Sequence, residues 1–278
     1  MNCLSFDVGG TTVKYGVIDE SYKILKKDKI PTPENENDFI YSLSNIIQEN
    51  LSIISKVSVA MPGYVNSANN KYLYGPHLKY DIDFSKLSNF TDYKFHLDND
   101  GNVAAYCEYF LNYKTKYSNL IMLTFGTGVG GGIISEGRLL RGMGNAGEIG
   151  HMLTSNDREI VGDSGKKGSF ESSVAASVWT KKCEELTQEN QDSELAKIFA
   201  TKNVGSVLFD NTLNLTNSEQ AARDEIIQNI SNGLLSLFEI FDNEAFILGG
   251  TMSSEPYDLI ELLAVSYTHL TLPTRFSV

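Results

Sequence analysis

The chain has 278 residues and a formal net charge of -12 at pH 7, and it contains no run of three or more consecutive lysine or arginine residues. This length is enough for about two domains, each able to bury its own core. The acidic balance argues against nucleic acid and anionic membranes as partners. We expect neither a signal peptide nor a membrane span, because acidic residues interrupt the apolar stretches that could form them. Cys3, Cys107 and Cys183 form no CxxC pair, which favours reduced thiols in a cytoplasmic protein.

Residues 1–117 are predicted to form a first lobe. Apolar, β-prone runs predict strands over residues 3–8, 13–18, 24–30, 57–60 and 95–97. An apolar stripe at helical spacing, from Phe39 to Ile47, predicts a helix over residues 37–50. A second helix is expected to begin at Asn99 or Asp100, either of which can cap it, and to run to about residue 113.

Residues 118–264 are predicted to form a second lobe, which opens with a strand at Leu120. A hairpin is expected around Glu136–Gly137, with apolar pairs on both sides of it. Helical spacing of apolar residues predicts helices over residues 172–186, 193–199 and 218–241. A buried strand over residues 245–248 is expected to end at Gly249–Gly250, and a further helix to begin near Pro256.

One short phrase occurs twice in the chain. Phe6–Ile18 reads FDVGGTTVKYGVI and Leu123–Ile134 reads LTFGTGVGGGII. Each copy is an apolar run, a loop of glycine and threonine, and a second β-prone run, which is typical of a strand that turns and returns. Successive backbone N–H groups in such a turn form a concavity that binds anions. The two copies therefore predict two related lobes that bind one polyphosphate.

Three known nucleotide-binding glycine motifs do not fit the sequence around them. Gly126, Gly128 and Gly131 satisfy the spacing GxGxxG of dinucleotide-binding proteins, but a helix should follow and the sequence predicts a hairpin instead. The same triplet resembles a protein-kinase glycine loop, yet the chain contains no HRD or DFG. The pair Gly165–Lys166 lacks the first glycine of a P-loop.

Polar residues near these loops suggest a site for a hydroxylated substrate. Asp100 can accept the proton of an attacking hydroxyl while Asn99 binds a neighbouring one, although an Asn-Asp-Gly turn that only caps a helix fits the local sequence equally well. Phosphoryl transfer tolerates a weak carboxylate base, since positioning and charge neutralisation dominate it. Glu148 and His151, three apart in NAGEIGH, suit vicinal hydroxyls, unless both are solvated surface groups.

Four motifs in this order resemble the ROK family, which comprises bacterial sugar kinases and related repressors. They are DVGGTT from Asp7, NDGN from Asn99, GTGVGGG from Gly126 and GEIGH from Gly147, and the match runs from about Asn2 to Ser253. The resemblance implies an α/β fold of the two-lobed actin-like ATPase class (ribonuclease H-like), with a mixed β-sheet in each lobe and the active site in the cleft between the lobes.

The resemblance also implies roles for single residues. ATP phosphates would be held by Gly9, Gly10, Thr11, Thr12 and Lys14 from one lobe and by Gly126, Thr127 and Gly128 from the other. Asp7 would place Mg²⁺ through water, and Gly249 and Gly250 would lie against the adenosine. The sugar pocket would be lined by Gly63, Asn99, Asp100, Glu148, His151 and Glu171, with Asp100 as the base. Taken alone, Lys14 could equally be a solvated strand residue, and Glu171 a charge favoured by a helix dipole.

The chain departs from the family pattern at a zinc site. Many members follow the GH motif with CxCGxxGCxE, whose cysteines join the histidine around a structural zinc. Here Gly162, Ser164 and Ser169 stand at those three positions. A closed zinc site needs about four nitrogen or sulfur ligands, so His151 alone cannot form one. We expect no zinc, and we expect the loop around Lys166 to be held by packing alone.

The end of the chain also departs from the family pattern. Residues 265–274, VSYTHLTLPT, do not continue the helix that begins near Pro256, and they match an in-frame translation of a common transposon-type sequencing adapter. We expect the natural sequence to end near Ala264 and residues 265–278 to be an artefact. A genuine irregular C-terminus is the alternative. The family's final helix, which should pack on the first lobe, would then be missing.

Together these features predict a cytoplasmic kinase that transfers phosphate from ATP to a hexose or N-acetylhexosamine, at C6, with a homodimer compatible with the family. One rival is a sugar-sensing repressor of the same family, which would carry a DNA-binding domain ahead of the DxGGT motif; here Asp7 stands close to Met1. Another rival is a different actin-like ATPase, such as an activator or acyl kinase. Glucose, N-acetylmannosamine, fructose and β-glucosides all remain open as substrates.

Overall fold

A computed structural model describes residues 2–75, 77–90, 94–155, 165–250, 259–263 and 276–277. The protein is an α/β protein with two compact units. The first unit comprises Met1–Ala104 and Arg141–Ala146, and the second comprises Ala105–Leu140 and Gly147–Val278. The division therefore falls earlier than residue 117 and returns the segment 141–146 to the first unit. Of residues 265–278, which we expect to be an artefact, the structure describes only Phe276–Ser277, and these two residues form a strand that pairs with residues 246–247.

The first unit is built on a five-stranded mixed sheet in the order β3-β2-β1-β4-β8. Its strands are β1 (Asn2–Val8), β2 (Thr12–Ile18), β3 (Ile24–Pro31), β4 (Ile54–Met61) and β8 (Lys94–Asn99). The strands β1, β2 and β3 form an antiparallel meander, whereas β4 pairs parallel to β1 and β8 pairs parallel to β4. The predicted strands of this lobe are all present.

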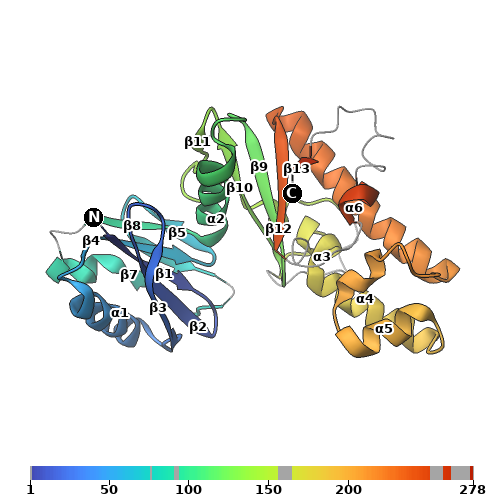
Figure 1. The fold of residues 1–278 in the computed structure, drawn as a ribbon, viewed down its shortest axis with the longest axis horizontal. Helices are drawn as coiled ribbons and strands as arrows, with labels where there is room; N and C mark the ends of the chain where they lie inside the picture. The colour runs from blue at the N-terminus through green and yellow to red at the C-terminus, as the bar shows by residue number, and fades with distance from the viewer. Residues whose placement is uncertain are drawn as a thin grey trace. The chain divides into compact units, whose positions relative to one another are not determined.

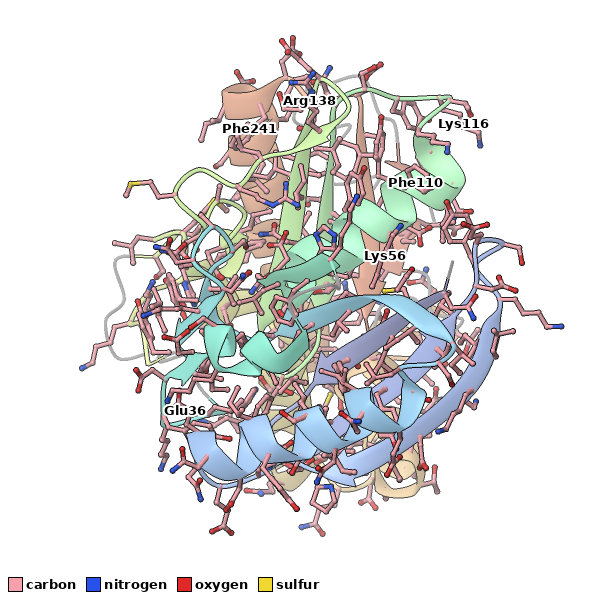
Figure 2. The ribbon with its side chains drawn as sticks, turned by 90° about the vertical axis from the view of Figure 1, so that its left-hand side faces the viewer. Glu36, Lys56, Phe110, Lys116, Arg138 and Phe241 are labelled. Atoms are coloured by element: carbon pink, nitrogen blue, oxygen red, sulfur yellow. The ribbon has the colours of Figure 1, made fainter. Side chains whose placement is uncertain are left out.

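Helix α1 (Glu36–Asn50) covers one face of this sheet (Figure 1). It begins where the side chain of Asn35 accepts a hydrogen bond from the backbone N–H of Asp38 at 3.0 Å, as a helix N-cap does. Figure 2 marks Glu36 in its first turn, where that carboxylate pairs with Lys86. The apolar stripe from Phe39 to Ile47 is buried in the core of the unit, as its spacing predicts.

A small antiparallel sheet was not predicted from the sequence. It contains β5 (Tyr64–Asn66), β6 (Lys71–Tyr74) and β7 (Ile82–Asp83), and a 3₁₀ segment, η1 (Phe84–Phe90), follows it. Its strands are two to four residues long, too short for the period-two alternation that identifies a strand. Val65, Tyr72 and Ile82 are its buried members and join the core of the first unit.

The second unit repeats the arrangement of the first, with strand order β11-β10-β9-β12-β13. Its strands are β9 (Leu120–Phe125), β10 (Val129–Ser135), β11 (Arg138–Leu139), β12 (Ala245–Gly250) and β13 (Phe276–Ser277). Again the first three form an antiparallel meander, and β12 pairs parallel to β9. The predicted hairpin around Glu136–Gly137 is therefore confirmed, which supports rejecting a dinucleotide-binding fingerprint at this loop.

The remaining helical segments begin at the end of β8 or later in the chain. They are α2 (Asp100–Glu108), which continues as a π-helical turn η2 (Tyr109–Tyr113), α3 (Phe170–Val174), α4 (Ala176–Glu189), α5 (Glu194–Lys202) and α6 (Asn217–Phe241), with 3₁₀ turns η3 (Ile149–His151) and η4 (Gly205–Phe209). The long helix α6 runs beside β12 (Figure 1). Residues 259–263 are also helical. Trp179 fills the core between Phe125 and Phe209, with ring centroids 6.1 and 4.9 Å away.

The helix predicted over residues 172–186 is two helices instead. Ala175 is extended, with φ -66° and ψ 151°, so α3 ends at Val174 and α4 begins at Ala176. The break is stabilised from outside the helix, because the carbonyl of Gly126 accepts the backbone N–H of Ala176 at 3.0 Å. Apolar spacing could not reveal this break, since it depends on a hydrogen bond to a distant loop.

Candidate active site

The first unit gathers its predicted site residues at one edge of its sheet. Strands β1, β4 and β8 are parallel, with Asp7 opposite Ala60 and Met61 opposite Asn99. Their carboxyl ends therefore meet at the same edge. The glycine loop after β1, Gly63 after β4, and Asn99–Asp100 at the end of β8 all lie there.

The loop Gly9–Thr11 is closed by its own hydrogen bonds. The N–H of Gly9 donates to the carbonyl of Thr12 at 2.9 Å, and the hydroxyl of Thr32 donates to the carbonyl of Gly9 at 2.6 Å. The N–H of Gly9 is therefore used within the turn. Among the described residues, nothing accepts a hydrogen bond from the N–H of Gly10 or Thr11. These two amides are the groups in the loop that can bind an anion.

A cation and a carboxylate flank this loop. Lys14 on β2 lies opposite Asp7 on β1 in the antiparallel register, and its Nζ is 3.7 Å from Oδ2 of Asp7. Both side chains are largely exposed, at 71% and 63%. An exposed ion pair at this distance contributes little to stability, so both groups remain available to a ligand. Hard oxygen ligands such as the Asp7 carboxylate fit Mg²⁺ and its bound waters.

Asn99 caps α2, which confirms the capping expectation. Its Oδ1 accepts the N–H of Asn102 at 3.0 Å, and its Nδ2 donates to the carbonyl of Gly63 at 3.0 Å. Capping and substrate binding do not exclude each other here. One hydrogen of the Asn99 amide is not used in these two contacts and can still reach a ligand.

Gly63 is held in a conformation that only glycine adopts readily. Its φ is +100°, and an added Cβ would lie 2.7 Å from both the Cα of Gly75 and the carbonyl oxygen of Tyr74. At Gly75 an added Cβ would lie 2.6 Å from the carbonyl oxygen of Pro62. The two glycines therefore let the end of β4 and the end of β6 touch through their backbones.

Asp100 is an exposed residue whose carboxylate is partly desolvated by the surrounding protein. The residue is exposed, yet the surrounding protein desolvates its carboxylate enough to raise its pKa above the ordinary value. The negative charge of Asp7 raises this pKa further, while a hydrogen bond from the N–H of Gly101 and the proximity of His77 oppose the shift. A raised pKa makes a carboxylate a stronger base in its ionised form.

Two residues that the sequence did not indicate support this edge. Oδ2 of Asp98 accepts a hydrogen bond from Nε of Arg141 at 2.8 Å, and Oδ1 of Asp98 accepts the backbone N–H of Asn99 at 2.9 Å. The Asp98 side chain is only 14% exposed. Arg141 follows β11, so the pair is distant in sequence and no local pattern could have identified it.

In the second unit, the loop Gly126–Gly128 is fixed by the start of α4. The hydroxyl of Ser177 donates to the carbonyl of Thr127 at 2.6 Å, and the N–H of Gly126 donates to the carbonyl of Gly128 at 2.9 Å. Within the described part of the chain, the N–H groups of Thr127 and Gly128 make no hydrogen bond. The loop thus offers two amides to an anion, as Gly9–Thr11 does.

Glu171 lies against this loop. Its Oε2 accepts the N–H of Val129 at 3.1 Å, and the carboxylate is so close to Gly128 that an added Cβ there would clash with it. The residue is buried, at 6% exposure, in the first turn of α3. Glu171 therefore connects the second glycine loop with the segment that precedes α3.

Glu148 and His151 lie together at η3. Nδ1 of His151 is 3.6 Å from Oε2 of Glu148. Burial lowers the pKa of His151, and the positive charge of Lys166 lowers it further, while Glu171 acts in the opposite direction. The imidazole is consequently neutral at neutral pH and can both donate and accept a hydrogen bond. Gly150 lets η3 pack directly on the backbone of Val129.

Gly249 and Gly250 end strand β12 beside the second glycine loop. Gly249 pairs with Thr124 and Gly250 with Phe125, directly before Gly126. Gly250 has φ +77°, and an added Cβ would clash with the carbonyl oxygen of Phe125. The structure thus brings together, within the second unit, Gly126, Thr127, Gly128, Glu148, His151, Glu171, Gly249 and Gly250.

Ser169, which stands at a zinc-ligand position of the family pattern, is a helix cap. Its Oγ accepts the N–H of Ser172 at 3.3 Å and donates to the carbonyl of Lys166 at 3.1 Å. Gly168 accepts two backbone hydrogen bonds, so the expectation that packing alone holds this loop is wrong for residues 166–169. Gly162 and Ser164 lie outside the described residues. Among those described, there is no group of three or more histidine, cysteine, aspartate or glutamate residues that could hold a metal ion.

A search of the described helices finds none with the length and apolar character needed to cross a membrane.

Comparisons with known proteins agree with the arrangement of these motifs. The model of the ROK family matches residues 3–272. A glucokinase of Streptomyces coelicolor is 27% identical over 280 residues, covering 95% of this chain and 86% of that protein. An N-acetylmannosamine kinase of Vibrio cholerae is 30% identical over 204 residues, covering 71% of this chain and 70% of that protein.

Among solved structures, a ROK family glucokinase from Streptomyces griseus in complex with glucose and AMPPNP superposes with a TM-score of 0.78. The two are 23% identical, and the alignment covers 99% of this chain and 93% of that one. This likeness extends to the whole two-unit α/β architecture that the four motifs implied. The chain belongs to the ROK family.

Proposed function

We propose that this protein transfers the γ-phosphoryl group of ATP to a sugar hydroxyl, with Asp100 as the base. The observation that carries the proposal is the position of Asp100: a carboxylate with a raised pKa, at the sheet edge where the free amides of Gly10 and Thr11 also lie. The relatives named glucokinase and N-acetylmannosamine kinase support a sugar as the acceptor.

The sugar is proposed to be a hexose or N-acetylhexosamine, phosphorylated at C6. Asp100 and the free amide hydrogen of Asn99 would bind it from the first unit, together with the backbone at Gly63. From the second unit, Glu148 and neutral His151 offer an acceptor and a donor or acceptor for neighbouring hydroxyls. Glu171, whose carboxylate touches the second loop, would help to hold that part of the site in place.

ATP is proposed to bind through backbone groups of both units. The amides of Gly10 and Thr11, with Lys14, would hold phosphate oxygens on one side, supported by the turn that Gly9 and Thr12 close. The amides of Thr127 and Gly128 would do so on the other, next to Gly126, with Gly249 and Gly250 against the adenosine. Asp7 fits a magnesium ion through water, and that ion would neutralise phosphate charge when bound.

The chemical step follows from these placements. The sugar hydroxyl oxygen attacks the γ-phosphorus, its proton passes to Asp100, and the bond from phosphorus to the bridging oxygen breaks to release ADP. A loose transition state needs little nucleophile activation, so the main contribution of the protein is alignment and charge neutralisation. The raised pKa of Asp100 favours uptake of the proton once the oxygen has begun to bond to phosphorus.

A substrate panel tests the proposal. Purified protein is incubated with ATP and Mg²⁺ and with single hexoses, N-acetylhexosamines, fructose or β-glucosides, and ADP release is measured with and without each sugar. We expect strongly sugar-dependent ADP release and a sugar phosphate in the product. Sugar binding without any ADP release would support a sugar-sensing regulator instead, and sugar-independent ADP release would support another ATPase.

A further inference from the structure

His77, which follows β6, lies on the first glycine loop. A methyl group added at Gly10 would come within 2.9 Å of its Cβ, 3.0 Å of its Cγ and 3.4 Å of its Nδ1. The imidazole therefore packs against the loop at the glycine whose N–H is free to bind an anion. Only a glycine leaves room for the ring at this point.

The same imidazole is close to the proposed base. Its positive charge, when present, stabilises ionised Asp100, whereas Asp7 has the opposite effect on that carboxylate. Burial and the charges of Tyr80 and Asp100 raise the pKa of the buried Tyr72 phenol on β6 to about 12, so it stays neutral. His77 is exposed, and its ring nitrogens are not consumed by any hydrogen bond with the described residues.

We propose that His77 is a catalytic residue that donates a hydrogen bond to the phosphoryl group during its transfer. The ring packs on the loop that would hold the phosphates and is near enough to act electrostatically on the carboxylate that would receive the sugar proton. This inference rests on the proposed function and adds a side-chain donor to what is otherwise a binding loop of backbone amides.

The chemistry of the step explains why a donor is useful there. As the bond to ADP breaks and the bond to the sugar oxygen forms, negative charge is spread over the three other oxygens of the phosphoryl group. A fixed N–H that points at these oxygens stabilises the transition state more than the ground state. His77 neither gains nor loses a proton in this role, since the sugar proton passes to Asp100.

The charged side chains around this loop support the role. The cation nearest the loop by the cross-strand register, Lys14, shares its charge with Asp7 and is 71% exposed. Asp7 and Asp100 both add negative charge beside the place where phosphates would bind. The His77 ring beside Gly10 adds a hydrogen-bond donor to this loop without a long, mobile side chain.

The test compares His77→Ala and His77→Gln with the wild type. We expect His77→Ala to lower kcat by about 100-fold, the lower end of the loss seen when one donor to a transition-state charge is removed, with little change in KM for the sugar. His77→Gln keeps a donor and should recover part of kcat. His96→Ala removes an exposed histidine from β8, outside the proposed site, and serves as the matched control.

A binding measurement separates catalysis from folding. Sugar with ADP and aluminium fluoride mimics the transferred phosphoryl group, whereas sugar with ADP alone does not. His77→Ala should weaken the fluoride complex by at least tenfold and leave ADP binding unchanged. If the wild type is an active sugar kinase and His77→Ala matches it in kcat and in fluoride binding, the inference is wrong. A loss explained fully by a smaller folded fraction also overturns it, whereas a wild type without sugar kinase activity overturns the proposed function itself.

Discussion

Nε of Arg141 donates a hydrogen bond to Oδ2 of Asp98 at 2.8 Å, and this ion pair ties the segment Arg141–Ala146 to strand β8. Asp98 also accepts the backbone N–H of Asn99, so the pair is connected directly to the turn that presents Asp100. A loop inserted within the sequence of the second unit thereby belongs structurally to the first.

Arg141→Ala is expected to weaken the proposed sugar site more than the fold. The guanidinium is half exposed, so the pair contributes at most about 1 kcal/mol to the free energy of unfolding. Loss of the pair frees Asp98 and loosens Asn99, which should raise KM for the sugar several-fold. Steady-state kinetics and thermal melting measure both effects. Arg138→Ala, at an exposed position of β11 labelled in Figure 2, is the control; equal effects of both substitutions would contradict the argument.

Asp100→Asn is expected to abolish turnover and stabilise the protein. The amide cannot accept the sugar proton, so kcat should fall by about 10² to 10⁴. Its Oδ1 can still accept the N–H of Gly101, so sugar affinity should change little. The folded pKa of Asp100 is raised, so the ionised carboxylate destabilises the fold at neutral pH. The melting temperature of Asp100→Asn at pH 7 should therefore exceed that of the wild type. The difference should vanish at a pH below the ordinary aspartate pKa of 3.8. Unchanged turnover would reject Asp100 as the base.

Gly128→Ala and Gly126→Ala form a matched pair in the second loop. An added Cβ at Gly128 clashes with the buried carboxylate of Glu171, whereas at Gly126 it meets nothing within 4 Å. We expect Gly128→Ala to cost about 1–3 kcal/mol of unfolding free energy. Gly126→Ala should leave the free energy of unfolding unchanged or slightly higher. Its only effect should be a higher KM for ATP. Chemical denaturation and ATP titration distinguish the two; equal destabilisation would show that Glu171 can move away.

The pH dependence of kcat/KM should show one acidic limb from Asp100, displaced above 3.8. Activity is lost as the pH falls through this raised pKa, because the base becomes protonated. His151 should add no limb at or above 6.5, since its pKa is lowered and it stays neutral there. A rate profile from pH 4 to 9, repeated for Lys166→Ala, checks this. Removal of the lysine should raise the pKa of His151; a neutral-pH inflection already present in the wild type would contradict the assignment.

The purified protein is expected to contain no stoichiometric zinc. Ser169 caps α3 where the family pattern has a cysteine, and a closed site needs about four nitrogen or sulfur ligands. Elemental analysis should give well below one zinc per chain, and a zinc-selective chelator should not change melting in the presence of Mg²⁺. One zinc per chain that resists dialysis would overturn this prediction.

Local patterns predicted most strands of the two five-stranded sheets and most helices, because each depends on the spacing of apolar residues and on neighbouring turn residues. The two glycine loops were predictable for the same reason, since strand, loop and returning strand are contiguous. The break at Ala175, the Asp98–Arg141 pair and the contact of His77 with Gly10 were not predicted. Each depends on segments brought together only by the fold, so the sequence near either partner carries no sign of the other.

The backbone contact between Gly63 and Gly75 restricts both positions to glycine. Each glycine occupies the space that a side chain at the other would need. A larger residue at either position would therefore have to move a strand end. A saturation-mutagenesis scan selected for growth on the sugar should therefore leave both positions almost invariant, and second-site suppressors of either should map to the 62–75 hairpin. In the proposed sugar site, substrate preference would then change through the surrounding side chains, while the backbone at this contact keeps its shape.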